Sequence, residues 1–198
     1  MEAPALHKPL SAEYPWPEQG MWTYEDWLRL PDDGYRYEIL EGELFMSPPP
    51  KVPHQRSSRG LFVRMCAHAA KHNSGEVFCA PIGVRIPGQK VPLQPDILFV
   101  KKNRSHIVEK DYIEGAPDLI VEILSPSNWT LDRREKFQAY QAAEVPEYWI
   151  VDYRAKTIEV FILESKNYVL TGKFGPGETV RATQMDGFSI QVDEVFSS

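Results

Sequence analysis

Two short apolar runs, each interrupted by a carboxylate, constrain the fold of this chain more than any other feature. The first spans residues 94–100 and carries Asp96 near its start, and the second spans residues 117–126 and carries Glu122 in its middle. Runs so rich in β-branched and apolar residues are typical of buried strands. A charged side chain is costly in such a strand unless a metal ion or a cation is paired with it. The two runs therefore predict a sheet that buries acidic groups together with their partners.

Composition and charge exclude several classes of protein. The chain has 198 residues, 42% of them hydrophobic, which suits one domain with a real core. No apolar stretch approaches the ~20 residues that span a bilayer, and the N-terminus lacks an apolar signal-peptide run. We therefore expect a cytoplasmic protein without membrane contact. The net charge of −6 argues against coating nucleic acid through bulk electrostatics, but it allows an enzyme with local basic groups.

The order of predicted elements indicates an α/β or α+β fold with a mixed central sheet flanked by helices. Residues 1–20 are rich in proline and predict a flexible N-terminal arm, and residues 21–198 predict a single domain. Helices are expected over residues 23–30, 54–73 and 131–143, and an N-terminal hairpin over residues 35–46. Besides the two carboxylate runs, strands are expected around residues 77–86, 148–152, 157–163, 168–170 and 188–196.

Asp96 and Glu122 are candidate ligands of a divalent metal ion. On neighbouring strands their carboxylates would lie within a few ångströms and could share one Mg²⁺ or Mn²⁺, since these hard cations prefer oxygen ligands. A water activated by such an ion can attack a phosphodiester. Lys136 lies in the early turns of the helix that leaves the Glu122 strand. It is the candidate for orienting that water or stabilising the transition state.

These three residues also have plainer interpretations. Glu122 could form a structural ion pair with Arg133 or another cation. Asp96 could be a turn residue that begins its strand. Lys136 could form a surface salt bridge with Asp132, four residues earlier.

Other acidic and basic groups could complete a site. His54, at the mouth of the first long helix, could bind a phosphate or accept a proton. Glu43 could supply an outer acidic ligand, as could Glu38 or Glu41, although Glu41 suits a turn. We interpret Asp118 as a turn or cap residue. The basic residues 101–104 favour either contact with DNA or an ordinary charged loop.

Two further patterns have a weaker claim to function. His68 and His72 have a zinc-like spacing but no evident third ligand, so a solvated helix face is the better interpretation. A carboxylate pair could also hydrolyse a sugar in an aromatic cleft. Trp129 and Trp149 lie near in sequence for that role, but core or lid positions explain both equally well.

Several segments are similar to the Uma-two family, whose members are described as "putative restriction endonucleases". The similarity covers about residues 23–196 and is most specific around Glu122. It includes Asp132, Lys136 and Tyr140. The matching segments are residues 37–44, 47–49, 54–55, 94–96, 115–127 and 145–152.

The resemblance implies the PD-(D/E)xK nuclease fold and Mg²⁺-dependent phosphodiester cleavage. By that resemblance Asp96 is the motif aspartate and Glu122 the acidic residue of the following motif. Leu124 stands where the parent pattern has lysine, and the family is thought to supply the lysine from the next helix, where Lys136 lies.

We therefore predict a metal-dependent endonuclease that hydrolyses DNA. The alternative is an inactive nuclease-fold protein that binds nucleic acid or a protein partner. A homodimer with twofold symmetry would suit cutting both strands.

Overall fold

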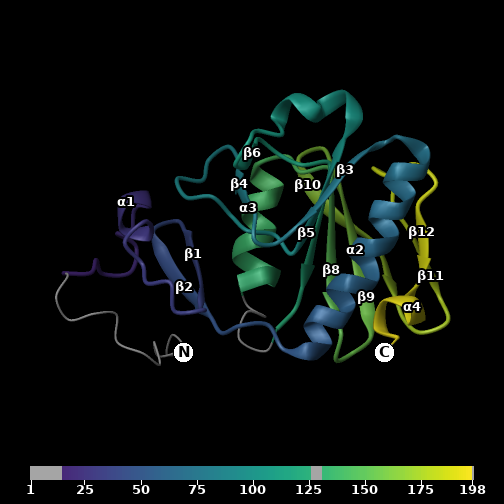
Figure 1. Cartoon of the computed structure of the whole chain (residues 1–198), viewed down its shortest axis with the longest axis horizontal. Coiled ribbons are helices and arrows are strands. Elements are labelled where there is room, and N and C mark those ends of the chain that lie inside the picture. Colours follow the sequence, from purple (N-terminus) through teal and green to yellow (C-terminus); the bar gives the residue numbers. More distant parts are fainter. Residues whose placement is uncertain (1–14, 126–130, 198) are drawn as a thin grey trace.

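A mixed sheet lies at the centre of the protein (Figure 1). The computed structural model describes residues 15–125 and 131–197, and within those ranges the central sheet has six strands in the order β10-β9-β8-β7-β5-β3. All neighbouring strands in it are antiparallel except β7 and β8. The predicted mixed sheet is thereby confirmed. Its strands are β3 (Gly75–Cys79), β5 (Ile97–Lys101), β7 (Leu119–Ile123), β8 (Glu147–Asp152), β9 (Thr157–Glu164) and β10 (Asn167–Phe174).

Helices cover both faces of this sheet, as expected. On one side, α2 (Val52–His72) packs over the face to which Leu119, Val121 and Ile123 of β7 contribute. On the other, α3 (Lys136–Ala142) packs over the face that contains Ile120. Because side chains alternate along a strand, Glu122 belongs to the α3 face. The burial of both faces explains why β7 is an almost continuous apolar run.

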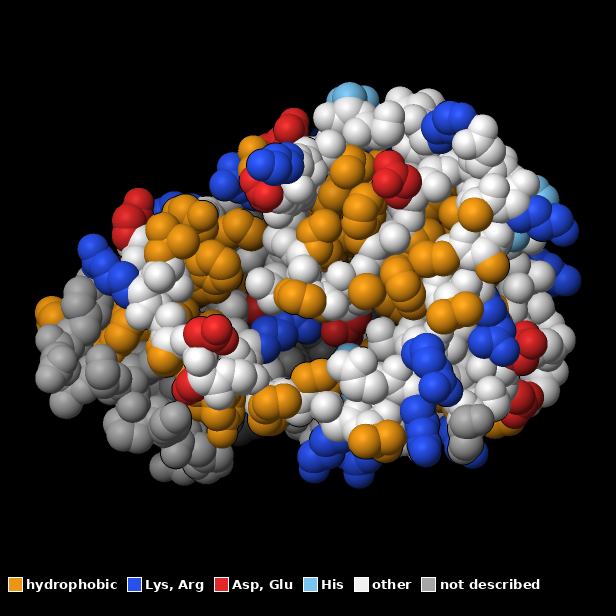
Figure 2. Space-filling model, in the orientation of Figure 1, with side chains coloured by type: hydrophobic (Ala, Val, Ile, Leu, Met, Phe, Trp, Pro, Cys, Tyr) orange, Lys and Arg blue, Asp and Glu red, His pale blue; other side chains and the backbone are white. Residues whose placement is uncertain are grey.

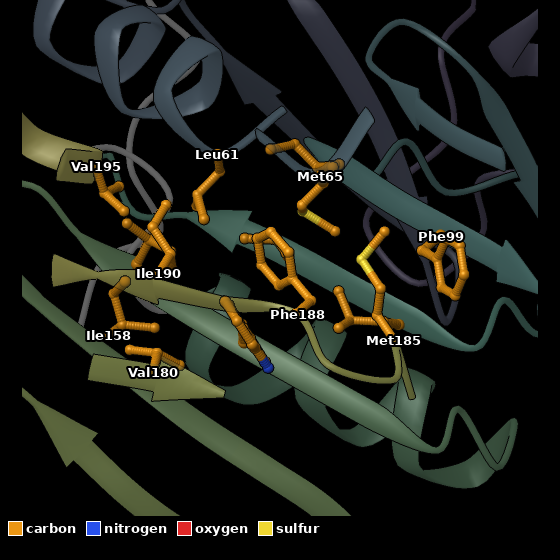
Figure 3. Packing of buried hydrophobic residues seen from close by; sticks show 14 of the residues in the cluster. Leu61, Met65, Phe99, Ile158, Val180, Met185, Phe188, Ile190 and Val195 are labelled. Atoms are coloured by element: carbon orange, nitrogen blue, oxygen red, sulfur yellow. The ribbon is translucent and has the colours of Figure 1, made fainter. Parts of the chain in front are cut away.

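The α2 face is completed by the C-terminal part of the chain, which consists of β11 (Thr179–Arg181), β12 (Ser189–Gln191) and α4 (Val192–Phe196). Leu61 and Met65 of α2 pack in one cluster with Phe188 (Figure 3). The strand expected over residues 188–196 is therefore only partly correct. Its second half is a short helix, at whose start the backbone N–H of Gln191 donates to Glu194.

An N-terminal lobe stands beside the sheet, at the left of Figure 1. It contains α1 (Tyr24–Trp27) and the hairpin of β1 (Arg36–Leu40) and β2 (Glu43–Ser47), which turns at residues 41 and 42 as predicted. A separate small core around Trp22 and Tyr37 holds the lobe together.

The predicted division into an arm and a domain stays a prediction, because residues 1–14 lie outside the described residues. Within the part of the predicted arm that is described, Gln19 exchanges two side-chain hydrogen bonds with the backbone of Leu44.

The remaining elements connect these layers. They are β4 (Gly83–Arg85), β6 (Tyr112–Glu114), the 3-10 helix η1 (Lys102–Ile107) and the π-helical turn η2 (Leu131–Glu135). η2 runs directly into α3, so together they form the helix expected over residues 131–143. Residues 126–130, which include Trp129, are outside the described part. No helix among the described residues is long and apolar enough to cross a membrane.

We predict that Gly42→Ala destabilises the protein more than Gly88→Ala does. Both glycines have positive φ, 80° and 87°, so each substitution should lower the free energy of unfolding by about 1–2 kcal/mol. A Cβ at position 42 would also collide with the carbonyl oxygen of Gly20, whereas no atom lies within 4 Å at position 88. Urea unfolding measures the difference, and equal losses would contradict it.

Candidate active site

The sheet brings Asp96 and Glu122 together. In the antiparallel pairing of β5 with β7, Ile97 lies opposite Val121, and continuing this register by one residue places Asp96 opposite Glu122. Directly opposite residues point to the same face. Asp96 is anchored to β7 by its Oδ2 atom, which accepts a 2.8 Å hydrogen bond from the backbone N–H of Ile123.

The side chain of Lys136 lies against Glu122 and is completely buried. Its Nζ atom is 3.1 Å from Oε1 of Glu122 and 3.1 Å from Oε1 of Glu38. One helical turn later, the Tyr140 hydroxyl donates a 2.7 Å hydrogen bond to the same Glu122 oxygen. Lys136 and Tyr140 both reach Glu122 because residues four apart share one face of a helix. Lys136 is thus no surface residue.

The hairpin strand β1 contributes two more charged side chains. Glu38 is buried and forms ion pairs with both Lys136 and Arg36. The Nη2 atom of Arg36 is 3.3 Å from Oε1 of Glu38. The other terminal nitrogen of Arg36 lies 3.1 Å from Oδ1 of Asp96. Arg36 therefore links the hairpin to the sheet through two carboxylates.

His54 joins the cluster from the first turn of α2. Its Nε2 atom is 3.3 Å from Oδ2 of Asp96. The chain reaches this position through the proline-rich segment after β2, and α2 begins at Val52 with Pro53 in its first turn, directly before His54. The other ring nitrogen, Nδ1, is buried and has no hydrogen-bond partner among the described residues.

These six side chains (Arg36, Glu38, His54, Asp96, Glu122 and Lys136) are called the charge cluster below. A small central cavity of about 50 Å³ lies against it, lined by five of the six, Glu38 being the exception. In Figure 2, acidic and basic side chains lie at the bottom of a hollow between the N-terminal lobe and the rest of the molecule. At roughly 30 Å³ of liquid volume per water molecule, the central cavity has room for an ion or one to two waters, but not for a nucleotide.

Burial and neighbouring charges perturb the carboxylates in opposite directions. Burial raises the pKa of Glu122 to about 7; the negative charge of Asp96 acts in the same direction, and Lys136 offsets only part of it. Burial alone would also raise the pKa of Asp96, but the hydrogen bond with His54 and the charge of Arg36 bring it well below the usual range. The pKa of Glu38 is lowered as well, because Arg36 and Lys136 outweigh its burial.

The charge balance of the cluster suits an additional cation. Three carboxylates, those of Glu38, Asp96 and Glu122, face the two permanent cations Arg36 and Lys136. The second oxygen of Glu38, Oε2, is buried and accepts no hydrogen bond from the part of the chain that the structure describes.

No three His, Cys, Asp or Glu side chains in the described part are arranged as a ready-made metal site. Mg²⁺ nevertheless commonly takes only one or two carboxylates and keeps several waters. The oxygen donors of Asp96 and Glu122 therefore fit such an ion.

Glu43 lies outside the charge cluster. It is exposed at the turn end of the hairpin, opposite Leu40, and the acidic side chain that enters the cluster from this hairpin is Glu38. Arg133 contacts Glu159 of β9 through two hydrogen bonds of 2.8 and 3.0 Å, and the cation beside Glu122 is Lys136.

Other candidates have local structural roles. Asp118 accepts a hydrogen bond from the backbone N–H of Lys101 and forms an ion pair with Arg104. These contacts hold the backbone of Lys101 and the side chain of Arg104 in place within the basic segment 101–104. His68 lies 2.9 Å from the backbone oxygen of Asp186.

Arg36 was missed by reasoning from the sequence, although a signal for it was present. Tyr35, Tyr37 and Ile39 alternate on one face of the hairpin strand, which places Arg36 and Glu38 together on the other. The alternation does not tell which part of the protein packs against that second face. It therefore could not predict the contacts of Arg36 with Asp96 and of Glu38 with Lys136.

This architecture is that of the restriction-endonuclease-like proteins. A crystal structure described as a putative nuclease belonging to DUF820, from Anabaena variabilis ATCC 29413, matches with a TM-score of 0.71. The match covers 88% of this chain and 97% of that one at 18% identity, so it speaks for the fold alone. The type IIG restriction endonuclease BpuSI gives a TM-score of 0.37 at 14% identity over 72% of this chain and 15% of its own.

The family follows from the sequence match. The family model Uma2, described as "Putative restriction endonuclease", matches residues 24–193. The chain belongs to the Uma2 family. No curated protein matches the chain.

We predict that Glu122→Gln stabilises the metal-free protein near pH 8 and has little effect near pH 5. The folded-state pKa of Glu122 is raised above its ordinary value of 4.5. The contribution of Glu122 to the free energy of unfolding is therefore complete below about pH 4.5 and is lost as the pH rises through about 7. Glutamine has no proton to lose. The expected gain near pH 8 is about 1–3 kcal/mol, measured by urea unfolding in EDTA.

Asp96→Asn is the matched control with the opposite sign. The pKa of Asp96 is lowered, so its contribution is present above the ordinary carboxyl pKa and is lost as the pH falls below it. This variant should be less stable than the wild type near pH 8. A Glu122→Gln variant that loses stability near pH 8 would contradict the raised pKa.

Proposed function

We propose that this protein is a metal-dependent endonuclease that hydrolyses phosphodiester bonds in DNA. The observation that carries the proposal is the charge cluster. Asp96 directly precedes β5, Glu122 lies in β7 and Lys136 lies in α3. Their side chains meet at one small cavity together with His54. Membership of a family described as putative restriction endonucleases supports the reaction class.

Each residue has a definite role in this proposal. Asp96 and Glu122 would hold a Mg²⁺ or Mn²⁺ ion, which when bound supplies charge neutralisation at the phosphate and activation of water. Lys136 supplies a fixed positive charge 3.1 Å from Glu122 Oε1, where it can stabilise the charge that develops on the phosphate oxygens. His54 is held by Asp96 and can accept a proton or donate to a phosphate oxygen.

A second candidate is supported by the ion pairs themselves. Arg36 and Lys136 already pair with all three carboxylates of the charge cluster. A nuclease-fold protein that binds nucleic acid or protein without catalysis would need no more than this network. Metal binding separates the two candidates.

The DNA backbone requires local positive charge, because the net charge of the chain is −6. Lys51, Arg56 and Arg59 are exposed at the end of α2 that carries His54. The basic segment 101–104 instead begins at the end of β5, whereas Asp96 directly precedes the start of that strand. We therefore favour the beginning of α2 as the path of the phosphate backbone.

We predict that Asp96→Asn, Glu122→Gln and Lys136→Met each abolish nicking of supercoiled plasmid in Mg²⁺. The two carboxylate variants should also lose Mg²⁺ binding by calorimetry, whereas Lys136→Met should keep it, because an ammonium group is not a metal ligand.

Asp118→Asn is the control, since Asp118 is a buried carboxylate with a cationic partner at the opposite end of β7. It should keep both metal binding and nicking, with its fold checked by circular dichroism. A wild-type protein that binds no divalent ion would exclude the metal-dependent mechanism and favour the second candidate.

We further expect Arg56→Ala to weaken binding to duplex DNA and to lower the slope of log affinity against log salt by about one. Lys102→Ala, which removes an exposed cation at the other end of β5, should change neither quantity. Fluorescence anisotropy at several salt concentrations measures both. The reverse result would place the DNA at η1.

A further inference from the structure

A second and much larger cavity adjoins the charge cluster. This side cavity has a volume of about 690 Å³, within the range of about 300–1,000 Å³ that small-molecule sites occupy. It shares Arg36, Pro50, His54 and Asp96 with the central cavity. A ligand in the side cavity would therefore lie directly beside the groups proposed to act on the phosphate.

The walls of the side cavity are largely aromatic and apolar. Trp27, Leu30 and Tyr35 line it from the N-terminal lobe. The Trp27 ring is held in place, because its indole N–H donates to the backbone oxygen of Tyr37 at 3.0 Å and its ring stacks on Tyr24. A fixed aromatic ring of this kind is a ready surface for stacking another planar ring.

Polar side chains also line this cavity. Gln94 and Gln55 carry amides that can donate and accept hydrogen bonds, as the edge of a nucleobase requires. Arg36 and His54, which also line the central cavity, border this cavity as well.

The charged residues that line the two cavities favour a different part of a nucleotide in each. The side cavity is lined by the carboxylates Asp32 and Asp96 as well as by Arg36, which makes it a poor place for a phosphate group. The central cavity has the buried ammonium of Lys136 and the candidate metal ligands. A nucleotide that occupies both would place its neutral base in the side cavity and its phosphate at the charge cluster.

We propose that the side cavity binds one unpaired nucleobase of the DNA strand that is cut, next to the scissile phosphate. This inference rests on the proposed nuclease function and specifies its substrate. A base inside a duplex is stacked on both sides, so it must leave the stack before it can enter a cavity. Leaving costs least for a base that is already unpaired. The preferred substrates are therefore DNA with bulged or mismatched bases and single strands.

The test compares three short fluorescein-labelled DNAs by anisotropy in EDTA, where nothing is cleaved. One is a fully paired duplex, one carries a single bulged thymidine, and one carries an abasic sugar at the bulge. The wild type should bind the thymidine bulge more tightly than the other two. Tyr35→Ala should reduce that binding by about fivefold to a hundredfold, the usual effect of removing a stacking aromatic, and leave the paired duplex unchanged.

Two further variants make the result specific. Tyr153→Ala removes another half-buried tyrosine, at the turn between β8 and β9, and should have no effect. Gln55→Trp fills the cavity from an exposed position on α2, so it should lower bulge binding without removing any packing. It tests the cavity even if Tyr35→Ala fails to fold.

The outcomes separate this inference from the proposed function. Equal binding of the three DNAs by the wild type, or equal weakening of all three by Tyr35→Ala and Gln55→Trp, overturns the base-binding cavity. A preference for the thymidine bulge that depends on these residues supports it, whether or not the protein nicks plasmid, because the assay contains no metal. Nicking in Mg²⁺ without any bulge preference leaves the nuclease proposal in place and removes only the cavity.

Discussion

The buried ammonium group of Lys136 connects three separate parts of the protein. It comes from α3, contacts Glu122 of the central sheet, and contacts Glu38 of the N-terminal hairpin at the same distance of 3.1 Å. Buried ion pairs add little net stability, because the loss of hydration offsets most of the attraction, yet removing the one cation that two buried carboxylates share is costly. Lys136 therefore fixes how the hairpin sits on the sheet more than it strengthens the fold. Arg36 reinforces that position through Asp96.

The charge cluster is poorly optimised as a structural core, and this is an argument for function. A structural core would balance the number of its positive and negative groups or replace them with apolar groups. Here three carboxylates share two permanent cations, and the pKa of Glu122 rises to about 7. Strongly perturbed carboxylates beside a cavity are typical of sites that handle charge.

The N-terminal lobe has a double role in this arrangement. Its β1 strand supplies Arg36 and Glu38 to the charge cluster, and its aromatic residues Trp27 and Tyr35 form a wall of the side cavity. The lobe has its own small core, so its residues can keep their geometry as a unit. A shift of the lobe relative to the sheet would therefore change both cavities at once.

Local sequence patterns determined the elements and the chemical types of the site. The apolar runs around Asp96 and Glu122 predicted buried strands, the hairpin turned where expected, and Lys136 was placed near Glu122 because its helix follows the same strand. These inferences succeed because periodicity and turn chemistry act over a few residues. Only the tertiary structure decided that Glu38, and not Glu43, meets Lys136, and that Arg36 pairs with Asp96. Such contacts depend on how one rigid layer docks on another, and the packing of whole faces decides that docking.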